Sequence, residues 1–334
     1  MKKDPVPLSL LVDDSCPAIH VYRNTWVDVH KKPPVAGDGR EMARDIPNAF
    51  LDRFCDVVLN HGIAGKLSIV PCPGGLGDIV SGLAGHGMAE VAEWLQTAKS
   101  RLSPAFDFSP EGLTHTFAVD LDTGRLLAED ENAWSAHQDR KALRRYLTRQ
   151  LALLKAAGVD ASGVTSPWVF GKQVEDEYRA AIMDSQYEVW GRTLSWYFLD
   201  ITDDSSARPV LIGGEDGRKL VSIPANMDDV LWATIWDFGK PDRGIVEGLA
   251  DRFLTRDGRG GRIREILDGG GWPALVTHWQ CLFSNGHETG LSVLDEVGKR
   301  VTRALGSEAE WTSCMRVAGK AWTQAGDGAV SEAR

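Results

Sequence analysis

Four side chains in this sequence combine residue types that carry hydrolytic chemistry with positions beside or within apolar runs. Asp13 and Asp14 come directly after the apolar run 8–12. His115 and His278 each lie within a later apolar run. Carboxylates and imidazoles bind divalent metal ions and also accept and donate protons in hydrolytic sites. Because adjacent side chains at a strand end point in different directions, one carboxylate can bind a cation while its neighbour faces a substrate.

Each of these residues also has a plainer interpretation. Asp14 can cap a turn, Asp13 can pair with an arginine, and a single histidine among apolar residues is commonly a hydrogen-bonded core group. His137, which precedes a long helical pattern, can equally be a solvated residue. Two such histidines and a carboxylate pair on separate strands nevertheless favour one joint functional site.

The apolar pattern predicts the elements that position these residues. Short apolar runs predict buried strands at 8–12, 67–70, 113–121, 164–170, 194–201, 209–212, 220–223, 231–236 and 274–283. Apolar residues at helical spacing predict helices at 47–60, 88–102, 141–157, 174–183, 289–305 and 308–324. Strands alternating with amphipathic helices favour an α/β fold with a mainly parallel sheet, open or closed into a barrel. In a barrel the carboxyl ends of the strands carry the chemistry, and the four residues lie at or near such ends.

Composition and charge narrow the class of protein. The chain has 334 residues, of which 43% are hydrophobic, as is typical of a globular protein large enough to fold without a structural metal or disulfide. The net charge of −10 argues against partners such as nucleic acid or an anionic membrane surface. The five cysteines lack CxxC spacing, the first apolar stretch is too short for export, and no run approaches ~18 apolar residues. We therefore expect a soluble cytoplasmic protein with reduced thiols.

Three short segments occur in a familiar order: Leu-Val-Asp-Asp-Ser at 11–15, Thr-His-Thr at 114–116 and Leu-Val-Thr-His at 275–278. They resemble the Thr-Phe-Asp-Asp-Gly motif, the start of the His-x-x-x-His motif and the Leu-Leu-His strand of the polysaccharide deacetylase superfamily. Members of that family are carbohydrate esterases on a distorted (β/α) barrel. The resemblance implies such a barrel over residues 1–305, with a C-terminal helix and mobile tail, 306–334, packed on it.

The resemblance also implies a role for each of the four residues. By analogy with the family's motifs, Asp13 would be the catalytic base and Asp14 a metal ligand. His115 would be a second metal ligand, and His278 would be the general acid. The implied cofactor is a divalent metal, with zinc as the first choice and manganese or iron as alternatives.

The third metal ligand and the substrate cleft are marked less directly. The family's second metal-binding histidine has no counterpart, because position 119 is valine. The third ligand would then be His137, displaced by an insertion, or Asp120. Residues 163–168 resemble a family strand that lines the cleft, although the family's arginine is absent, and a tryptophan at a strand end can stack on a sugar. The expected substrate-binding residues are therefore Ser166, Trp168, Trp279 and Asp228.

These expectations combine into one leading hypothesis and two alternatives. The leading one is a metal-dependent hydrolase that removes an acetyl or other acyl group from a soluble saccharide or a related amide. The second is a metal-free enzyme on the same barrel that cleaves a glycosidic bond with Asp13 and either Asp200 or Asp229. The third is a non-catalytic carbohydrate-binding protein whose site has decayed. The sequence does not indicate an oligomeric state.

Overall fold

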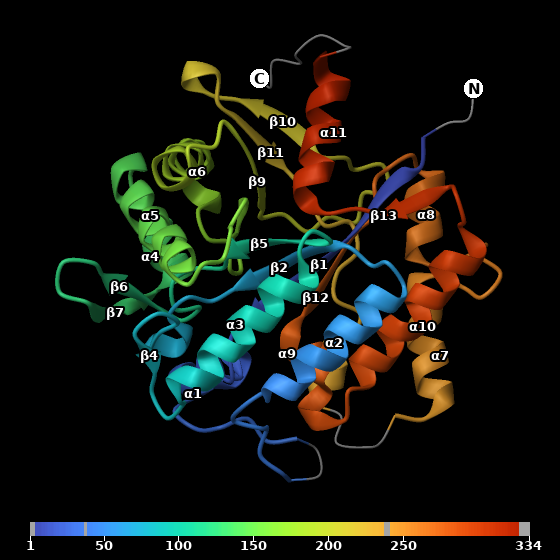
Figure 1. Ribbon diagram of the computed structural model, residues 1–334, viewed down its shortest axis with the longest axis horizontal. Helices are drawn as coiled ribbons and strands as arrows, with labels where there is room; N and C mark the ends of the chain where they lie inside the picture. The colour runs from blue at the N-terminus through green and yellow to red at the C-terminus, as the bar shows by residue number, and fades with distance from the viewer. Residues whose placement is uncertain (1–3, 37–38, 237–240, 327–334) are drawn as a thin grey trace.

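Two sheets of mostly parallel strands form the centre of the computed structural model, which describes residues 4–36, 39–236 and 241–326 (Figure 1). The first sheet has the strand order β12 (Ala274–His278), β1 (Val6–Ser15), β2 (Gly65–Ile69) and β5 (Phe106–Pro110). The second has the order β10 (Val210–Gly213), β11 (Lys219–Ser222), β9 (Leu194–Phe198) and β8 (Gly163–Thr165). The β10–β11 pair is antiparallel, and the other pairs of these strands are parallel.

Isolated parallel bridges join the two sheets along both edges. Between β5 and β8, Phe108 pairs with Ala161 and Glu111 pairs with Thr165. On the other side the segment 225–227 links the end of β9 to β12, through the bridges Ile201–Ala225 and Met227–Leu275. The strands therefore follow one another around a distorted ring. This arrangement confirms the predicted α/β fold of the distorted-barrel type.

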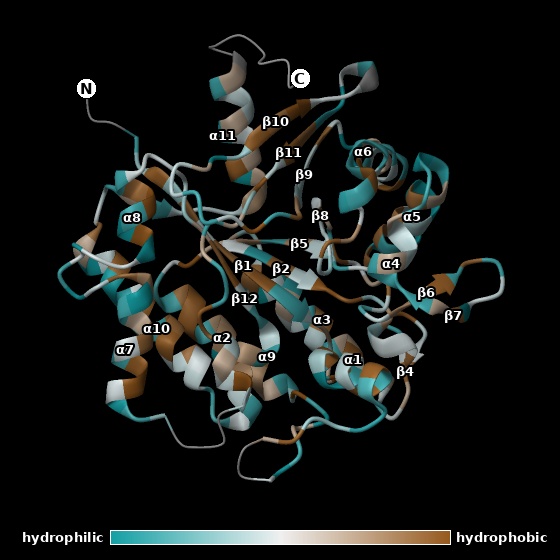
Figure 2. Ribbon diagram, turned by 180° about the vertical axis from the view of Figure 1, so that it is seen from behind, coloured by the Kyte–Doolittle hydropathy of each residue, from teal (hydrophilic) through white to brown (hydrophobic). Residues whose placement is uncertain are grey.

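Most helices cover the outside of the strands, because each buries one apolar stripe against them. Helix α5 (Arg140–Ala156) shows the pattern most clearly: Asp139 caps its N-terminus, and the buried Leu143, Leu147, Leu151 and Leu154 share one face. In Figure 2 the outer helices alternate teal and brown, whereas β10 and β11 are largely brown. The other helices are α1 (Val21–His30), α2 (Asn48–Asn60), α3 (Met88–Leu102), α4 (Glu131–Ser135), α6 (Glu175–Trp190), α7 (Arg243–Phe253), α8 (Arg262–Asp268), α9 (Trp279–Phe283), α10 (Thr289–Ala304) and α11 (Cys314–Gly326).

The segment after residue 305 is joined closely to the rest of the chain. Strand β13 (Ala309–Trp311) pairs in parallel with the first residues of β1. Helix α11 then packs against strands of both sheets, where Cys314 and Val317 belong to the same buried cluster as Leu11 of β1 and Trp196 of β9. The extra C-terminal helix is thus present. Most of the predicted mobile tail lies outside the described residues.

Several predicted elements differ from the structure. The predicted strand 113–121 is a loop followed by the short strand β6 (Phe117–Asp120), which forms a hairpin with β7 (Arg125–Asp130). The predicted strand 231–236 is a 3₁₀ helix over Trp232–Trp236, and the predicted strand 274–283 ends at His278, where α9 begins. In each case an apolar run too short to show periodicity belongs to a turn or helix instead. Among the described residues, no helix has the length and apolar character needed to cross a bilayer.

Candidate functional site

The end of β1 sends its two adjacent carboxylates in different directions. Asp13 is still in register with His278 of β12, but the pairing between β1 and β2 shifts after Val12. Asp14 adopts a left-handed backbone conformation with φ of 61°, which a non-glycine residue seldom takes up. Both side chains are buried. The local distortion therefore gives Asp13 and Asp14 separate surroundings within one site.

Asp14 meets His115 and a glutamate that follows β5. Its Oδ1 lies 2.7 Å from His115 Nε2, and Glu111 Oε1 lies 3.7 Å from the same nitrogen. The three ligand atoms of Asp14, Glu111 and His115 all lie within 4.8 Å of one another, and all three residues are buried. We call these residues the Asp14 group.

Hydrogen bonds fix one oxygen of each carboxylate and leave the other facing His115. The Asp14 backbone N–H donates to Glu111 Oε2 at 2.6 Å, and the Ser68 hydroxyl donates to the same oxygen. The Gln280 side-chain amide donates to Asp14 Oδ2 at 2.5 Å. Such partners orient metal ligands in proteins, and their loss typically weakens metal binding.

The loop that carries His115 is organised around a buried glutamate. The backbone N–H groups of Leu113 and Thr114 donate to Glu131 Oε1 at 2.6 and 3.0 Å, and that of His115 donates to Oε2 at 2.9 Å. The Tyr146 hydroxyl also donates to Oε1, at 2.7 Å. Burial raises the pKa of Glu131 in spite of these donors. The loop has a left-handed residue at His115, with φ of 57°, and Glu131 stabilises this unusual path.

Opposite charges dominate the electrostatics of the Asp14 group. Burial alone would raise the pKa of Asp14, but the nearby imidazolium of His115 holds that pKa well below its usual value. Burial alone would likewise lower the pKa of His115, but the Asp14 charge raises it well above its usual value. Each group therefore favours the charged form of the other.

The Asp14 group fits a divalent cation. Asp14 Oδ1 and His115 Nδ1 are buried, and among the described residues neither atom has a hydrogen-bond partner. The close approach of Asp14 Oδ1 to His115 Nε2 thus lacks hydrogen-bond geometry, and such buried unsatisfied atoms are costly. Two carboxylates and one imidazole match the ligand preferences of zinc, manganese and iron, and their two negative charges balance a divalent ion.

A second histidine lies beside this group and is held by a carboxylate. His278 Nδ1 lies 2.8 Å from Asp229 Oδ2, and the His278 backbone N–H donates to the same oxygen at 3.1 Å. Asp229 also accepts from Leu231 N and from the Thr277 hydroxyl. Burial works against a charged His278, but Asp229 and Asp14 raise its pKa above the usual value. Asp229, His278 and the buried Cys281 form a second set of converging ligand atoms, which we call the His278 group.

Asp13 is buried and paired with a lysine. Its Oδ1 forms an ion pair with Lys66, a fully buried residue of β2. Lys66 also donates to the Thr165 hydroxyl at 2.9 Å and lies over the ring of Phe198. Burial lowers the pKa of Lys66 to about 8. The pair engages Asp13 Oδ1 and leaves Oδ2 outside it.

Two exposed tryptophans lie beside the two histidines. The Trp168 ring is 4.7 Å from the His115 ring between centroids, and the Trp232 ring is 4.9 Å from that of His278. Trp168 is 46% exposed and Trp232 is 38% exposed, which is high for such large apolar side chains. The two rings therefore present flat apolar surfaces to solvent close to the polar centre.

The other residues predicted for the site lie elsewhere or are already engaged. His137 is exposed beside Glu129, and Asp120 binds the backbone N–H groups of a turn, so neither joins the Asp14 group. Trp279 is fully buried against Phe50, Phe54 and Trp94, a position that is incompatible with stacking on a substrate.

Ser166 and Asp228 also have partners other than a substrate. Ser166 shares a hydrogen bond of 2.8 Å with the Tyr178 hydroxyl. Asp228 is exposed and accepts from the backbone N–H of Asp229. Asp229, its neighbour, is therefore the residue that contacts His278.

Sequence reasoning missed Glu111 because it missed β5. The segment Phe106-Asp107-Phe108-Ser109 alternates apolar and polar residues, which is a strand pattern, and Glu111 follows it after Pro110. Lys66, Gln280 and Glu131 carry no comparable pattern. Their roles depend on contacts between residues far apart in the chain.

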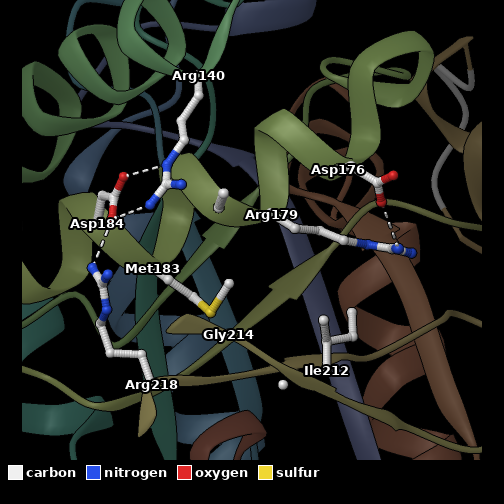
Figure 3. A pocket seen from close by; sticks show the side chains of 10 residues that line it. Arg140, Asp176, Arg179, Met183, Asp184, Ile212, Gly214 and Arg218 are labelled. Carbon is white, nitrogen blue, oxygen red and sulfur yellow. Dashed lines mark hydrogen bonds and ion pairs between the residues drawn. The ribbon is translucent and has the colours of Figure 1, made fainter. Parts of the chain in front are cut away.

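A separate pocket of about 370 Å³ shares no residue with this site (Figure 3). Arg140 of α5 and Arg218, just before β11, both bond the carboxylate of Asp184 of α6, at 2.7 and 2.6 Å. Both cations lower the pKa of Asp184 against the effect of burial. The pocket wall is thus an ion-paired junction between α5, α6 and the segment just before β11.

Comparisons with known proteins give little further information. No family model and no curated protein matches the sequence. A solved CE4 family pseudoenzyme from Bacillus anthracis is 8% identical with a TM-score of 0.42, and the match covers 94% of this chain and 65% of that chain. A GH57 branching enzyme from Thermococcus kodakaraensis is 11% identical with a TM-score of 0.45, covering 98% of this chain and 72% of that chain. A 4-alpha-glucanotransferase from Thermococcus litoralis is 10% identical with a TM-score of 0.43, covering 80% of this chain and 35% of that chain. At these TM-scores the likenesses carry no argument about function.

Proposed function

We propose that this protein is a metal-dependent hydrolase that removes an acetyl or similar acyl group from a saccharide. The observation that carries the proposal is the Asp14 group. Its buried Asp14 Oδ1 and His115 Nε2 are 2.7 Å apart without hydrogen-bond geometry, and a second carboxylate lies beside them. A cation among these atoms would satisfy them all.

Asp14, Glu111 and His115 would hold the cation. A divalent ion there would supply positive charge for the acyl oxygen and lower the pKa of the attacking water. Gln280 and Ser68 would keep the two carboxylates aimed at the centre, since each bonds the carboxylate oxygen that faces away from His115. Zinc fits this donor set, as do manganese and iron.

Asp13 would accept the proton of the attacking water. The Lys66 pair fixes the orientation of the carboxylate through Oδ1, so Oδ2 is the oxygen left to receive the proton. As the carbon–oxygen bond to water forms, the bond between the acyl carbon and the sugar nitrogen or oxygen breaks.

His278 would return a proton to the departing sugar atom. Asp229 holds Nδ1 at 2.8 Å, so the proton would leave from Nε2. Its side chain is 22% exposed, which is enough for contact with a leaving group at the mouth of the site. The same carboxylate would stabilise the ring while it is charged.

The exposed rings favour a saccharide as the substrate. Trp168 and Trp232 present apolar faces beside the two histidines. Tryptophan rings combine a large apolar face with low conformational cost, and sugars offer matching apolar C–H faces. A sugar ring on either surface would bring its acyl group toward the polar centre.

The test combines metal content with acetate release. Wild-type protein, Glu111→Gln and His137→Gln would be assayed for bound metal and for acetate release from a panel of N- and O-acetylated sugars. We expect about one metal per chain and chelator-sensitive release for the wild type. Glu111→Gln should lose both, whereas His137→Gln, which alters an exposed histidine, should keep both.

Each alternative predicts a different outcome. A metal-free protein that cleaves glycosidic bonds after chelation would favour the carboxylate-pair enzyme. Saccharide binding without any turnover by the metal-loaded protein would favour the binding protein. Absence of bound metal under replete conditions would exclude the proposed mechanism.

A further inference from the structure

The His278 group places three chemically different ligand atoms close together. Asp229 lies in the loop after β11, His278 ends β12, and Cys281 lies in the first turn of α9. Their ligand atoms all lie within 4.8 Å of one another. Cys281 is fully buried, whereas the His278 side chain is 22% exposed. The cluster is therefore enclosed on the thiol side and open on the imidazole side.

We propose that the His278 group is a second cation site, selective for thiophilic divalent metals such as zinc, cadmium or cobalt. Its donors are one sulfur, one imidazole nitrogen and one carboxylate oxygen, a set that favours such ions over magnesium or manganese. The Asp14 group offers two oxygens and one nitrogen and lacks sulfur. The two groups therefore differ in softness while carrying the same charge once the thiol is ionised.

Occupation of the His278 group has a cost. The Cys281 side chain is fully buried, so a metal that binds its sulfur must reach an enclosed position. A bound metal would replace the thiol proton and any proton on His278 Nδ1, and both would pass to solvent. It would also break the hydrogen bond between His278 and Asp229. We therefore expect the His278 group to fill after the Asp14 group, when metal is in excess.

Metal binding at the His278 group would inhibit the enzyme, an expectation that rests on the proposed function. A metal on His278 Nδ1 prevents Asp229 from holding the ring for proton transfer, and it places positive charge beside the leaving group. The metal that activates the enzyme at one equivalent would then inhibit it at two. Magnesium and manganese, which avoid thiolate ligands, would lack this inhibitory phase.

Cobalt titration of the whole protein tests the site without any activity assay. Thiolate coordination gives cobalt a sulfur-to-metal charge-transfer absorption that oxygen and nitrogen ligands do not give. We expect the first equivalent to bind without this absorption and the second to produce it. Cys281→Ser should bind one equivalent fewer and lack the absorption, while Cys72→Ser, which removes a more accessible thiol, should behave as wild type.

A second variant keeps the test valid if Cys281→Ser fails to fold. His278→Gln alters a partly exposed side chain and should remove the second equivalent and its absorption. Charge-transfer absorption that persists in both variants, or that disappears in Cys72→Ser, would overturn the proposal. So would a wild-type protein that binds no second equivalent. Because this readout is spectroscopic, failure of the second site is distinguishable from failure of the proposed hydrolase activity.

Discussion

His115 and His278 lie at the same end of the sheet but are held in opposite ways. The His115 backbone is fixed by Glu131, and its Nε2 faces two carboxylates without hydrogen-bond geometry to Asp14. His278 is fixed through its side chain, because Nδ1 contacts Asp229 at 2.8 Å. The first arrangement suits a metal ligand, whose lone pair must point at a fixed place. The second suits a residue that carries a proton.

The difference shows that residue type alone does not assign a role. Both rings lie beside carboxylates, and the pKa of each is raised. The two sites differ in whether the carboxylate oxygens beside the imidazole already accept hydrogen bonds from other groups. Asp229 is taken up by the backbone and side chain around His278, whereas Asp14 Oδ1 remains without a hydrogen-bond partner in the described part of the chain.

The largest expected effect comes from removing a ligand of the Asp14 group. His115→Gln should lose the metal and reduce the rate by more than about 1,000-fold, because several kcal/mol of charge stabilisation disappear. Metal analysis and acetate release on the same preparation measure both effects. A variant that keeps its metal and its rate would contradict the assignment of His115 as a metal ligand and of His278 as the proton donor.

A smaller effect is expected from the other histidine. His278→Gln should keep the metal of the Asp14 group and lose about 100-fold in kcat, since a positioned proton donor contributes on that scale. Substrates with good leaving groups, which need no proton, should lose less. Metal loss equal to that of His115→Gln would show that the two histidines share one role.

The residues behind the ligands give a further test. Gln280→Leu should weaken metal binding by about 10- to 100-fold, because Asp14 Oδ2 loses its donor. Gln150→Leu is the matched control. Gln150 is also a buried glutamine, but its amide has no hydrogen-bond partner among the described residues, so its replacement should leave metal affinity unchanged. Competition with a chromophoric chelator measures both affinities.

His20 is fully buried and extends the comparison, because no carboxylate among the described residues forms a hydrogen bond or ion pair with its ring. Burial lowers its pKa to about 4 from the usual 6.5. The unfolded chain therefore binds the proton first, and stability falls as the pH drops from 6.5 toward 4. Replacement by asparagine, which can still cap α1, should remove about 2 to 3 kcal/mol of this acid-induced loss. Urea unfolding of both proteins at pH 7 and 4.5 measures the difference; equal losses would contradict the account.

Sequence patterns predicted the strands and helices better than the residues of the site. Strand β1 and helix α5 follow from the apolar run 8–12 and the helical spacing over 141–157, which are local properties. Asp14 and His115 do come together, as the resemblance implied. The position of Glu111 depends on the bridge that joins β5 to β8, and that of Lys66 depends on three other strands. Such contacts join residues that are far apart in the sequence, so no local pattern predicts them.

The most direct test of the central claim is the position of the metal in a crystal of the manganese- or zinc-loaded protein. Anomalous diffraction at the absorption edge of the metal would locate the ion independently of any assay. We expect a peak among Asp14 Oδ1, Glu111 Oε1 and His115 Nε2 at one equivalent of metal. Absence of a peak at saturating metal, or a single peak bound to His137 or to the His278 group alone, would contradict the account.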